Sequence, residues 1–290
     1  MIQRKIEKVT LHTPTSGMLG KGHLSTQIIG FQDFIDTDPF IVLMDEKLDL
    51  SGIEATGGQH PHAGVEIYTI LFRGTSGDIP TGNMELMTAG KGVVHTEEVK
   101  GNIQANVLQL WVALPPEKRW TEPFLQSIDL ENAPTQKTID GEIRVYSGSA
   151  FELASPLRGN TPVTIVDFYL ETYAETTQYI PSSYNGFVLV KEGNVSVSGV
   201  ELKQGESGWL NKTYQSGESE ITYKAGQGGA RFFLYAGEPQ KRPIVIQGPF
   251  IGDTHEDISR LFTEYRNDKM KHIRSYPSKH FTSRPGKTMN

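Results

Sequence analysis

Short apolar runs separated by turn-forming residues dominate the first 250 positions of the chain. Runs of strand length lie at residues 40–44, 67–72, 107–114, 163–170, 186–190 and 231–235. Pairs such as Ser-Gly, Gly-Asn and Gly-Glu stand between them, and these favour turns. Many short strands with frequent turns predict an all-β fold built as a sandwich or barrel.

The run at residues 107–114 differs from the others because both of its faces are apolar. Alternate side chains of a strand point to opposite faces. Here Leu108, Leu110 and Val112 form one set, and Val107 and Trp111 belong to the other. We therefore expect a central strand that is buried on both sides.

A polar stretch near residues 126–142 separates two groups of strand signals. It contains Pro134 and few strand-forming residues. This pattern predicts an amino-terminal β domain at residues 1–130 and a second β domain at residues 131–250. Residues 251–290 would add a helix and a tail.

Helical spacing is found after residue 250. Thr254 followed by Asp257 has the pattern of a capping box, which marks the beginning of a helix. One apolar stripe follows at helical spacing, formed by Ile258, Leu261, Phe262 and Tyr265. We expect one amphipathic helix here.

The composition narrows the class of protein. The 290 residues include no cysteine, which excludes disulfides, thiolate metal sites and cysteine nucleophiles. The net charge of -6 argues against general nucleic-acid binding. No stretch approaches about twenty uninterrupted apolar residues, so we expect neither a membrane span nor a signal peptide, and a cytoplasmic protein.

The tail at residues 266–290 is basic although the rest of the chain is acidic. It carries Arg266, Lys269, Lys271, Arg274, Lys279, Arg284 and Lys287. Such a tail can be an arm that binds nucleic acid or a protein partner. We favour the alternative, a solvated extension that lies on the acidic body.

Three of the eight histidines lie close together in the sequence, in two pairs. His60 and His62 form a His-x-His pair, and His95 and Glu97 form a His-x-Glu pair. On a strand, residues two apart point to the same face. If the two pairs occupy neighbouring strands, three imidazoles and one carboxylate converge. This set suits a divalent ion of iron, nickel, copper, zinc or manganese.

The motifs around these residues also resemble a known family. Residues 58–66 resemble the first cupin motif, and residues 82–95 resemble the second. The form H-P-H-x-G-x-E at residues 60–66, followed by M-T-A-G-x-G-x-x-H-x-E at 87–97, is similar to the pirin family. The segments at residues 38–40, 109–115 and 248–250 also match that family in order.

The resemblance implies two tandem cupin barrels of the jelly-roll type, with one metal ion in the first barrel. Its ligands would be His60, His62, His95 and Glu97, and Fe(II) is the first expectation, with Ni, Zn, Cu or Mn as alternatives. Many cupins use the glutamate that corresponds to Glu66 instead, but pirin-like proteins favour Glu97. Residues 143–246 contain no histidine, so the second barrel would be structural.

The resemblance also implies a function. Enzymatic members of the family resemble quercetin dioxygenases, which would make a small aromatic flavonol the substrate and Glu97 the catalytic proton acceptor. The alternatives are a regulator that binds a transcription factor or metabolic enzyme, and a metal protein without turnover. The connection at residues 74–82 is shorter than is usual in the family, and Ala63 replaces its usual arginine. From the short connection at residues 74–82 we expect a wider cavity mouth than is usual in the family.

Overall fold

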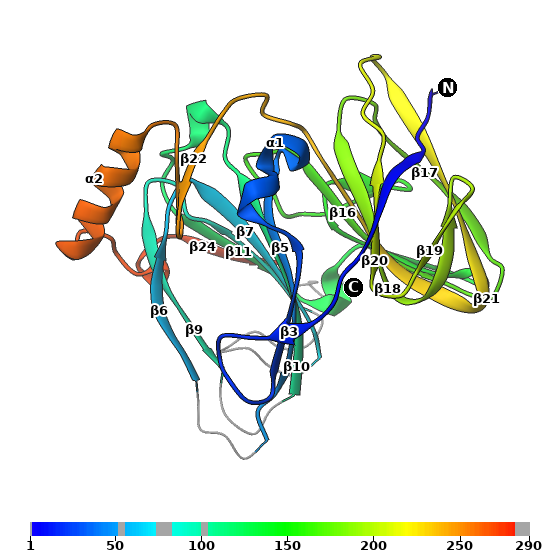
Figure 1. The fold of residues 1–290 in the computed structure, drawn as a ribbon, viewed down its shortest axis with the longest axis horizontal. Coiled ribbons are helices and arrows are strands. Elements are labelled where there is room, and N and C mark those ends of the chain that lie inside the picture. The colour runs from blue at the N-terminus through cyan, green and yellow to red at the C-terminus, as the bar shows by residue number, and fades with distance from the viewer. Residues whose placement is uncertain (1, 52–55, 74–82, 100–103, 282–290) are drawn as a thin grey trace, which may run out of the picture.

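A computed structural model of the chain describes residues 2–51, 56–73, 83–99 and 104–281. Two large β-sheets organise these residues and form two adjoining lobes (Figure 1). The all-β class expected from the sequence is confirmed. No helix within the described ranges is long and apolar enough to cross a membrane.

The first domain consists of one large sheet and a separate pair of strands. In spatial order, the large sheet contains β24 (Ser278–Phe281), β11 (Phe124–Ile128), β8 (Met84–Thr88), β7 (Val65–Arg73), β10 (Gln104–Ala113), β5 (Phe40–Asp49), β4 (His23–Ile29) and β3 (Thr15–Ser16). The separate pair is formed by β6 (Thr56–His62) and β9 (Val93–Val99). In Figure 1 this pair lies to one side of the large sheet.

The second domain is built on the other large sheet. Its main path contains β12 (Thr135–Thr138), β13 (Gly141–Ser147), β16 (Val163–Leu170), β21 (Glu218–Gly237), β18 (Asn185–Val197), β20 (Glu206–Leu210) and β2 (Ile6–Leu11). Three further strands pair beside it, namely β1 (Ile2–Gln3), β17 (Glu175–Pro181) and β19 (Val200–Lys203). Aromatic and branched aliphatic side chains fill its interior.

Short elements complete the described structure. The small strand pairs are β14 (Ser149–Ala150) with β15 (Leu153–Ala154), and β22 (Val245–Gln247) with β23 (Phe250–Gly252). The helical elements are η1 (Phe31–Asp33), α1 (Phe34–Thr37), η2 (Pro116–Lys118), η3 (Leu130–Asn132), α2 (His255–Arg266) and η4 (Ile273–Ser275).

The two ends of the chain do not follow the expected domain boundaries. We placed residues 1–130 in the first domain, but β1 pairs with β21 and β2 pairs with β20 in the second sheet. Conversely, β24 comes from the expected tail and pairs with β11 in the first sheet. The physical reason is that backbone groups on an edge strand can pair with any extended segment, whatever its side-chain pattern.

The central strand predicted from its two apolar faces is confirmed. Strand β10 lies between β5 and β7. On one face, Leu108 and Leu110 pack into a core that the two domains share, together with Phe187 and Phe233 of the second domain. The other face carries Trp111, which packs in the interior of the first domain. Strand β10 therefore connects the domain interface to the interior of the first domain.

The expected amphipathic helix is α2. The Thr254 hydroxyl accepts a hydrogen bond from the Asp257 backbone N–H at 3.2 Å, and Asp257 accepts one from the Thr254 backbone N–H at 3.1 Å. This is the predicted capping box. Ile258 and Leu261 are buried in a cluster with Val94 of β9. Helix α2 thus supports the outside of the β6–β9 pair.

The described part of the basic tail also docks on the first domain. The Val94 backbone N–H of β9 donates to the Lys271 carbonyl at 3.0 Å, and His272 Nε2 lies 3.2 Å from the Thr96 hydroxyl. Residues 278–281 then form β24. These contacts agree with an extension that lies on the body, while the last nine residues of the tail are outside the described ranges.

Candidate metal centre

The register of the β6–β9 pair brings the predicted histidines together. In this antiparallel pair His60 lies opposite His95, His62 opposite Val93, and Gly58 opposite Glu97. Residues that lie opposite each other share a face, and so do residues two apart on one strand. His60, His62, His95 and Glu97 therefore lie on the same face of the pair, as the spacing predicted.

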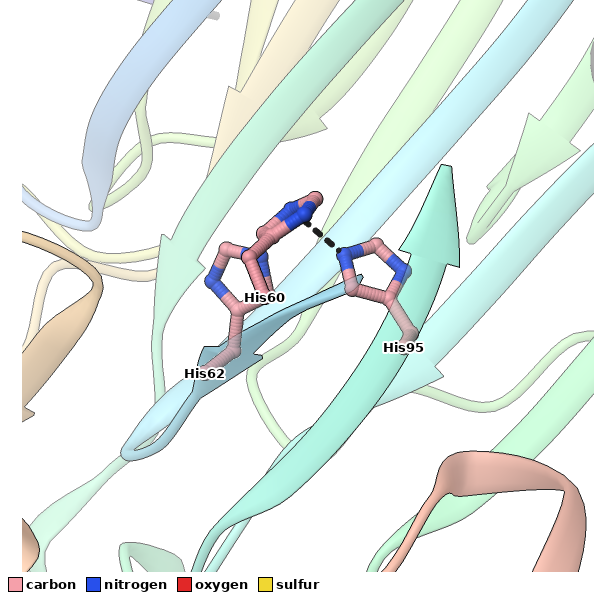
Figure 2. Close-up of side chains that lie close together, drawn as sticks. All are labelled: His60, His62 and His95. Atoms are coloured by element: carbon pink, nitrogen blue, oxygen red, sulfur yellow. Dashed lines mark hydrogen bonds between the residues drawn. The ribbon is translucent and has the colours of Figure 1, made fainter. Parts of the chain in front are cut away.

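The three imidazoles converge on one point. One ring nitrogen of each histidine lies within 4.8 Å of those of the other two. His60 Nε2 and His95 Nε2 are 2.9 Å apart, and the three ring centroids are separated by 4.3 to 4.9 Å. Figure 2 shows the rings turned toward one another from the two strands. Within the described ranges, this is the one group of histidine, aspartate or glutamate side chains that has the geometry of a metal site.

The chemistry of these donors fits a divalent metal. Two imidazole nitrogens at 2.9 Å need a proton or a cation between them, because two lone pairs repel. A divalent metal ion bound by the converging nitrogens of the three imidazoles would remove this repulsion.

Burial keeps two of the histidines in the neutral form that binds metal. His62 is 2% exposed and His95 is 7% exposed. The pKa of His95 is lowered to about 4, mainly by burial; Glu97 opposes this shift, and the charge of His60 adds to it. Burial also lowers the pKa of His62 well below its usual value, as do the charges of His95 and His60. At neutral pH both rings are therefore neutral, and each has one nitrogen whose lone pair is free to bind a metal.

Glu97 lies at the edge of the cluster. Its Oε2 is 3.7 Å from His60 Nε2, and its Oε1 is 3.9 Å from His95 Nε2. The side chain of Glu97 is 37% exposed. The carboxylate is therefore within reach of an ion held by the histidines. Its role as the fourth ligand stays a prediction.

Glu66, the alternative carboxylate, is directed to another part of the molecule. It is fully buried on β7 and accepts hydrogen bonds from the Thr88 hydroxyl, from the backbone N–H and side-chain amide of Asn160, and from the backbone N–H of Thr161. Asn160 and Thr161 lie two to three residues before the first residue of β16 in the second domain. The contacts of Glu66 thus fasten the second domain to the first.

Two glycines allow the turns that position the β6–β9 pair. Gly64 has φ +75, and a Cβ there would lie 2.0 Å from the Ile251 carbonyl oxygen. Gly90 has φ +50, and a Cβ there would lie 2.0 Å from the Thr121 carbonyl oxygen. These backbone conformations and close approaches require glycine. They fix the turn after β6 and the turn before β9.

The sequence did not single out Gln109, Trp111 and Phe31 as parts of the site. Gln109 Nε2 donates to Glu97 Oε1 at 2.7 Å. The Trp111 ring lies edge-on to His62 at 4.7 Å and to Phe31 at 5.7 Å. Gln109 is the one polar residue in the apolar run at residues 107–114, and that exception was the available signal. The expected wider mouth depends on residues 74–82, which lie outside the described ranges.

Comparisons with known proteins identify the family. Residues 21–112 match the sequence model described as Pirin, and residues 165–271 match the Pirin C-terminal cupin domain. Pirin-1 from Arabidopsis thaliana is 31% identical over 242 residues, which cover 80% of this chain and 83% of that protein.

Solved structures show the same fold. Quercetin 2,3-dioxygenase from Acinetobacter baumannii is similar with a TM-score of 0.81 and 24% identity, covering 93% of this chain and 99% of that one. The bacterial pirin YhhW from Escherichia coli, in complex with nickel(II), has a TM-score of 0.59 and 16% identity, covering 80% of this chain and 99% of that one. The expected pair of cupin domains is confirmed, and the chain belongs to the pirin family.

Proposed function

We propose that this pirin-family protein is a metal-dependent dioxygenase that acts on flavonols or related enolic aromatic compounds. The observation that carries the proposal is the group of three histidines with a carboxylate 3.7 to 3.9 Å from two of them. The structural similarity to a quercetin 2,3-dioxygenase supports the choice of substrate class.

We further propose that the centre holds one divalent ion per chain, with Fe(II) as the first candidate. His60, His62 and His95 would bind it through imidazole nitrogens, and Glu97 would complete the set. Ni, Zn, Cu and Mn accept the same donors, and the nickel complex of YhhW supports a divalent ion. When bound, the ion supplies a Lewis acid that polarises the substrate oxygen.

The side chains around the centre bind and orient the substrate. Trp111 packs on His62 and holds that ring in place. Phe31 continues this aromatic surface toward solvent, since it contacts Trp111 and is 42% exposed. A flat aromatic ligand can rest against such a surface while the apolar wall excludes water.

Glu97 would move the proton. A flavonol hydroxyl must lose its proton before the ring becomes electron-rich enough to react with dioxygen. The Glu97 carboxylate lies beside the histidines and is partly exposed, so it can accept this proton from a bound substrate.

Oxygen consumption tests the proposal directly. Metal-free protein would be reloaded with Fe(II), titrated with quercetin without oxygen, and then exposed to dioxygen. We expect one dioxygen to be consumed for each quercetin, and no consumption with the metal-free protein. Quercetin binding without oxygen uptake, with Fe(II) and with each alternative metal, would show that the proposed activity is wrong.

A further inference from the structure

The Glu97 carboxylate makes its shortest described contact with a residue that lies outside the candidate ligand set. Gln109 Nε2 donates to Glu97 Oε1 at 2.7 Å, whereas the nearest histidine nitrogens are 3.7 and 3.9 Å away. A half-exposed glutamate rotates freely about its last bonds when nothing holds it. The orientation of this carboxylate therefore depends on Gln109.

The orientation of Gln109 is itself set by Trp111. The Trp111 indole Nε1–H donates to Gln109 Oε1 at 3.3 Å. An indole nitrogen can only donate, so the amide must turn its oxygen toward Trp111. The NH₂ group of the amide is then directed at Glu97. Without this contact, the two ends of the amide could exchange places and present an oxygen to the carboxylate.

The backbone holds this chain of contacts rigidly. Gln109 and Trp111 are two residues apart on β10, so their side chains share the face that looks into the first domain. Strand β10 is paired on both sides, with Gln109 opposite Met44 of β5 and Thr69 of β7. Because the same Trp111 ring contacts His62, one strand supports both the histidine cluster and the carboxylate.

We infer that Gln109 is a positioning residue that presents the Glu97 carboxylate to the metal centre through one oxygen. Oε1 is engaged by the Gln109 amide, and Oε2 is the oxygen that lies toward His60. Oε2 is thus the atom that ligates the ion or accepts the substrate proton. The inference deepens the proposed function and rests on it for the catalytic role of Glu97.

The test measures metal binding rather than turnover. Co(II) is the probe, because its visible absorption reports on the ligand geometry. Gln109→Leu keeps a side chain of similar length but removes the donor to Glu97. Losing such an outer contact typically weakens metal binding about 10–100-fold. We expect the Co(II) dissociation constant of Gln109→Leu to rise by about tenfold or more, and the absorption spectrum to shift.

Gln126 provides the matched control. This glutamine is also in the first domain, is buried, and makes two hydrogen bonds with the backbone of Arg158. Gln126→Leu should destabilise the protein but leave Co(II) affinity and spectrum unchanged. Trp111→Phe keeps an aromatic ring beside His62 but removes the indole donor. It should weaken Co(II) binding in the same direction as Gln109→Leu, by a smaller factor.

A double-mutant comparison shows whether Gln109 acts through Glu97. In a Glu97→Ala background, the carboxylate that Gln109 positions is gone, so Gln109→Leu should change Co(II) affinity no further. The same loss of affinity in both backgrounds would overturn the inference, as would unchanged affinity and spectrum in Gln109→Leu. If Gln109→Leu does not fold, an unchanged Co(II) spectrum in Trp111→Phe overturns it. Failure of quercetin oxidation in the wild type would overturn only the proposed function.

Discussion

The two domains share one architecture but fill their interiors differently. In the second domain, Phe168 stacks on Phe232 at 4.8 Å and lies 5.0 Å from Tyr223, within an apolar core. In the first domain, the β6–β9 pair instead buries His62 and His95. Burying apolar rings stabilises a domain, while burying neutral imidazoles costs free energy unless a partner satisfies them. The second domain is thus suited to stability and the first to binding.

The shared core connects these two roles. Strand β10 packs Leu110 against the second domain and holds Trp111 against His62 on its other face. Glu66 accepts its hydrogen bonds from Asn160 and Thr161 across the same interface. A well-packed second domain can therefore fix the backbone that carries the metal centre without contributing a ligand.

Removing a histidine tests most directly whether the first domain alone binds the metal. His95→Ala deletes one of three convergent donors, so metal affinity should fall by more than the roughly 10–100-fold that an outer contact costs. Elemental analysis of freshly purified protein should give one metal per chain for the wild type and close to none for the variant. Two metals per chain in the wild type would show that the second domain also binds an ion.

Replacing Glu97 separates binding from chemistry inside the first domain. Glu97→Gln keeps the shape and one coordinating oxygen but removes the charge and the basicity. We expect metal to remain, more weakly bound, and turnover of metal-loaded protein to fall about 10²–10⁴-fold. Steady-state oxygen consumption at full metal occupancy measures this. Unchanged turnover in Glu97→Gln would show that another group accepts the proton.

The second domain should respond to substitution in the opposite way. Phe168→Ala removes a fully buried ring from the aromatic stack and should lower the free energy of unfolding by about 3–5 kcal/mol. Folded Phe168→Ala should still bind one metal with wild-type affinity. Denaturant unfolding of metal-free protein and Co(II) titration below the transition would measure the two quantities. If Phe168→Ala also lost metal affinity, the second domain would contribute to metal binding and not to stability alone.

The sequence predicted the part of the centre that depends on local geometry. The period of two along a strand placed the histidine pairs and Glu97 on one face, and both apolar faces of residues 107–114 indicated the central strand. The partners of β2 could not be predicted, since Val9 and Leu11 are exposed and no local pattern names the strand beside them. Strand β24 was missed for a related reason, because three of its four residues are polar and its parallel pairing with β11 is made by backbone groups, which no side-chain pattern announces. The contact of Gln109 with Glu97 depends on how β10 faces the β6–β9 pair, which spacing within one strand does not show.

Glu66→Gln tests the interface that joins the domains, and its effect should depend on pH. Burial raises the pKa of Glu66, although the hydrogen bonds from Asn160, Thr88 and Thr161 oppose this rise. Because the folded pKa of Glu66 is higher than its unfolded pKa, the folded protein binds more protons between these two values. The contribution of Glu66 to the free energy of unfolding is therefore fully present below the unfolded pKa. It is lost as pH rises through the folded pKa. Glutamine does not titrate, and its NH₂ group would face the donors of Asn160.

We therefore expect Glu66→Gln to cost on the order of 1–3 kcal/mol near pH 4.5, the usual penalty for a mismatched buried polar group. The difference in the free energy of unfolding between Glu66→Gln and the wild type should become smaller toward pH 7. Urea unfolding of metal-free wild type and Glu66→Gln between pH 4.5 and pH 7 measures this difference in the free energy of unfolding. The titration of His62 and His95 contributes equally to both proteins and cancels in the difference. Metal content should be unchanged, because the bonds of Glu66 run to the second domain rather than to the histidines. A difference that widens with rising pH would show that the buried carboxylate is stabilised by its donors more than it is penalised by burial. Loss of metal in Glu66→Gln would instead indicate that Glu66 is a metal ligand.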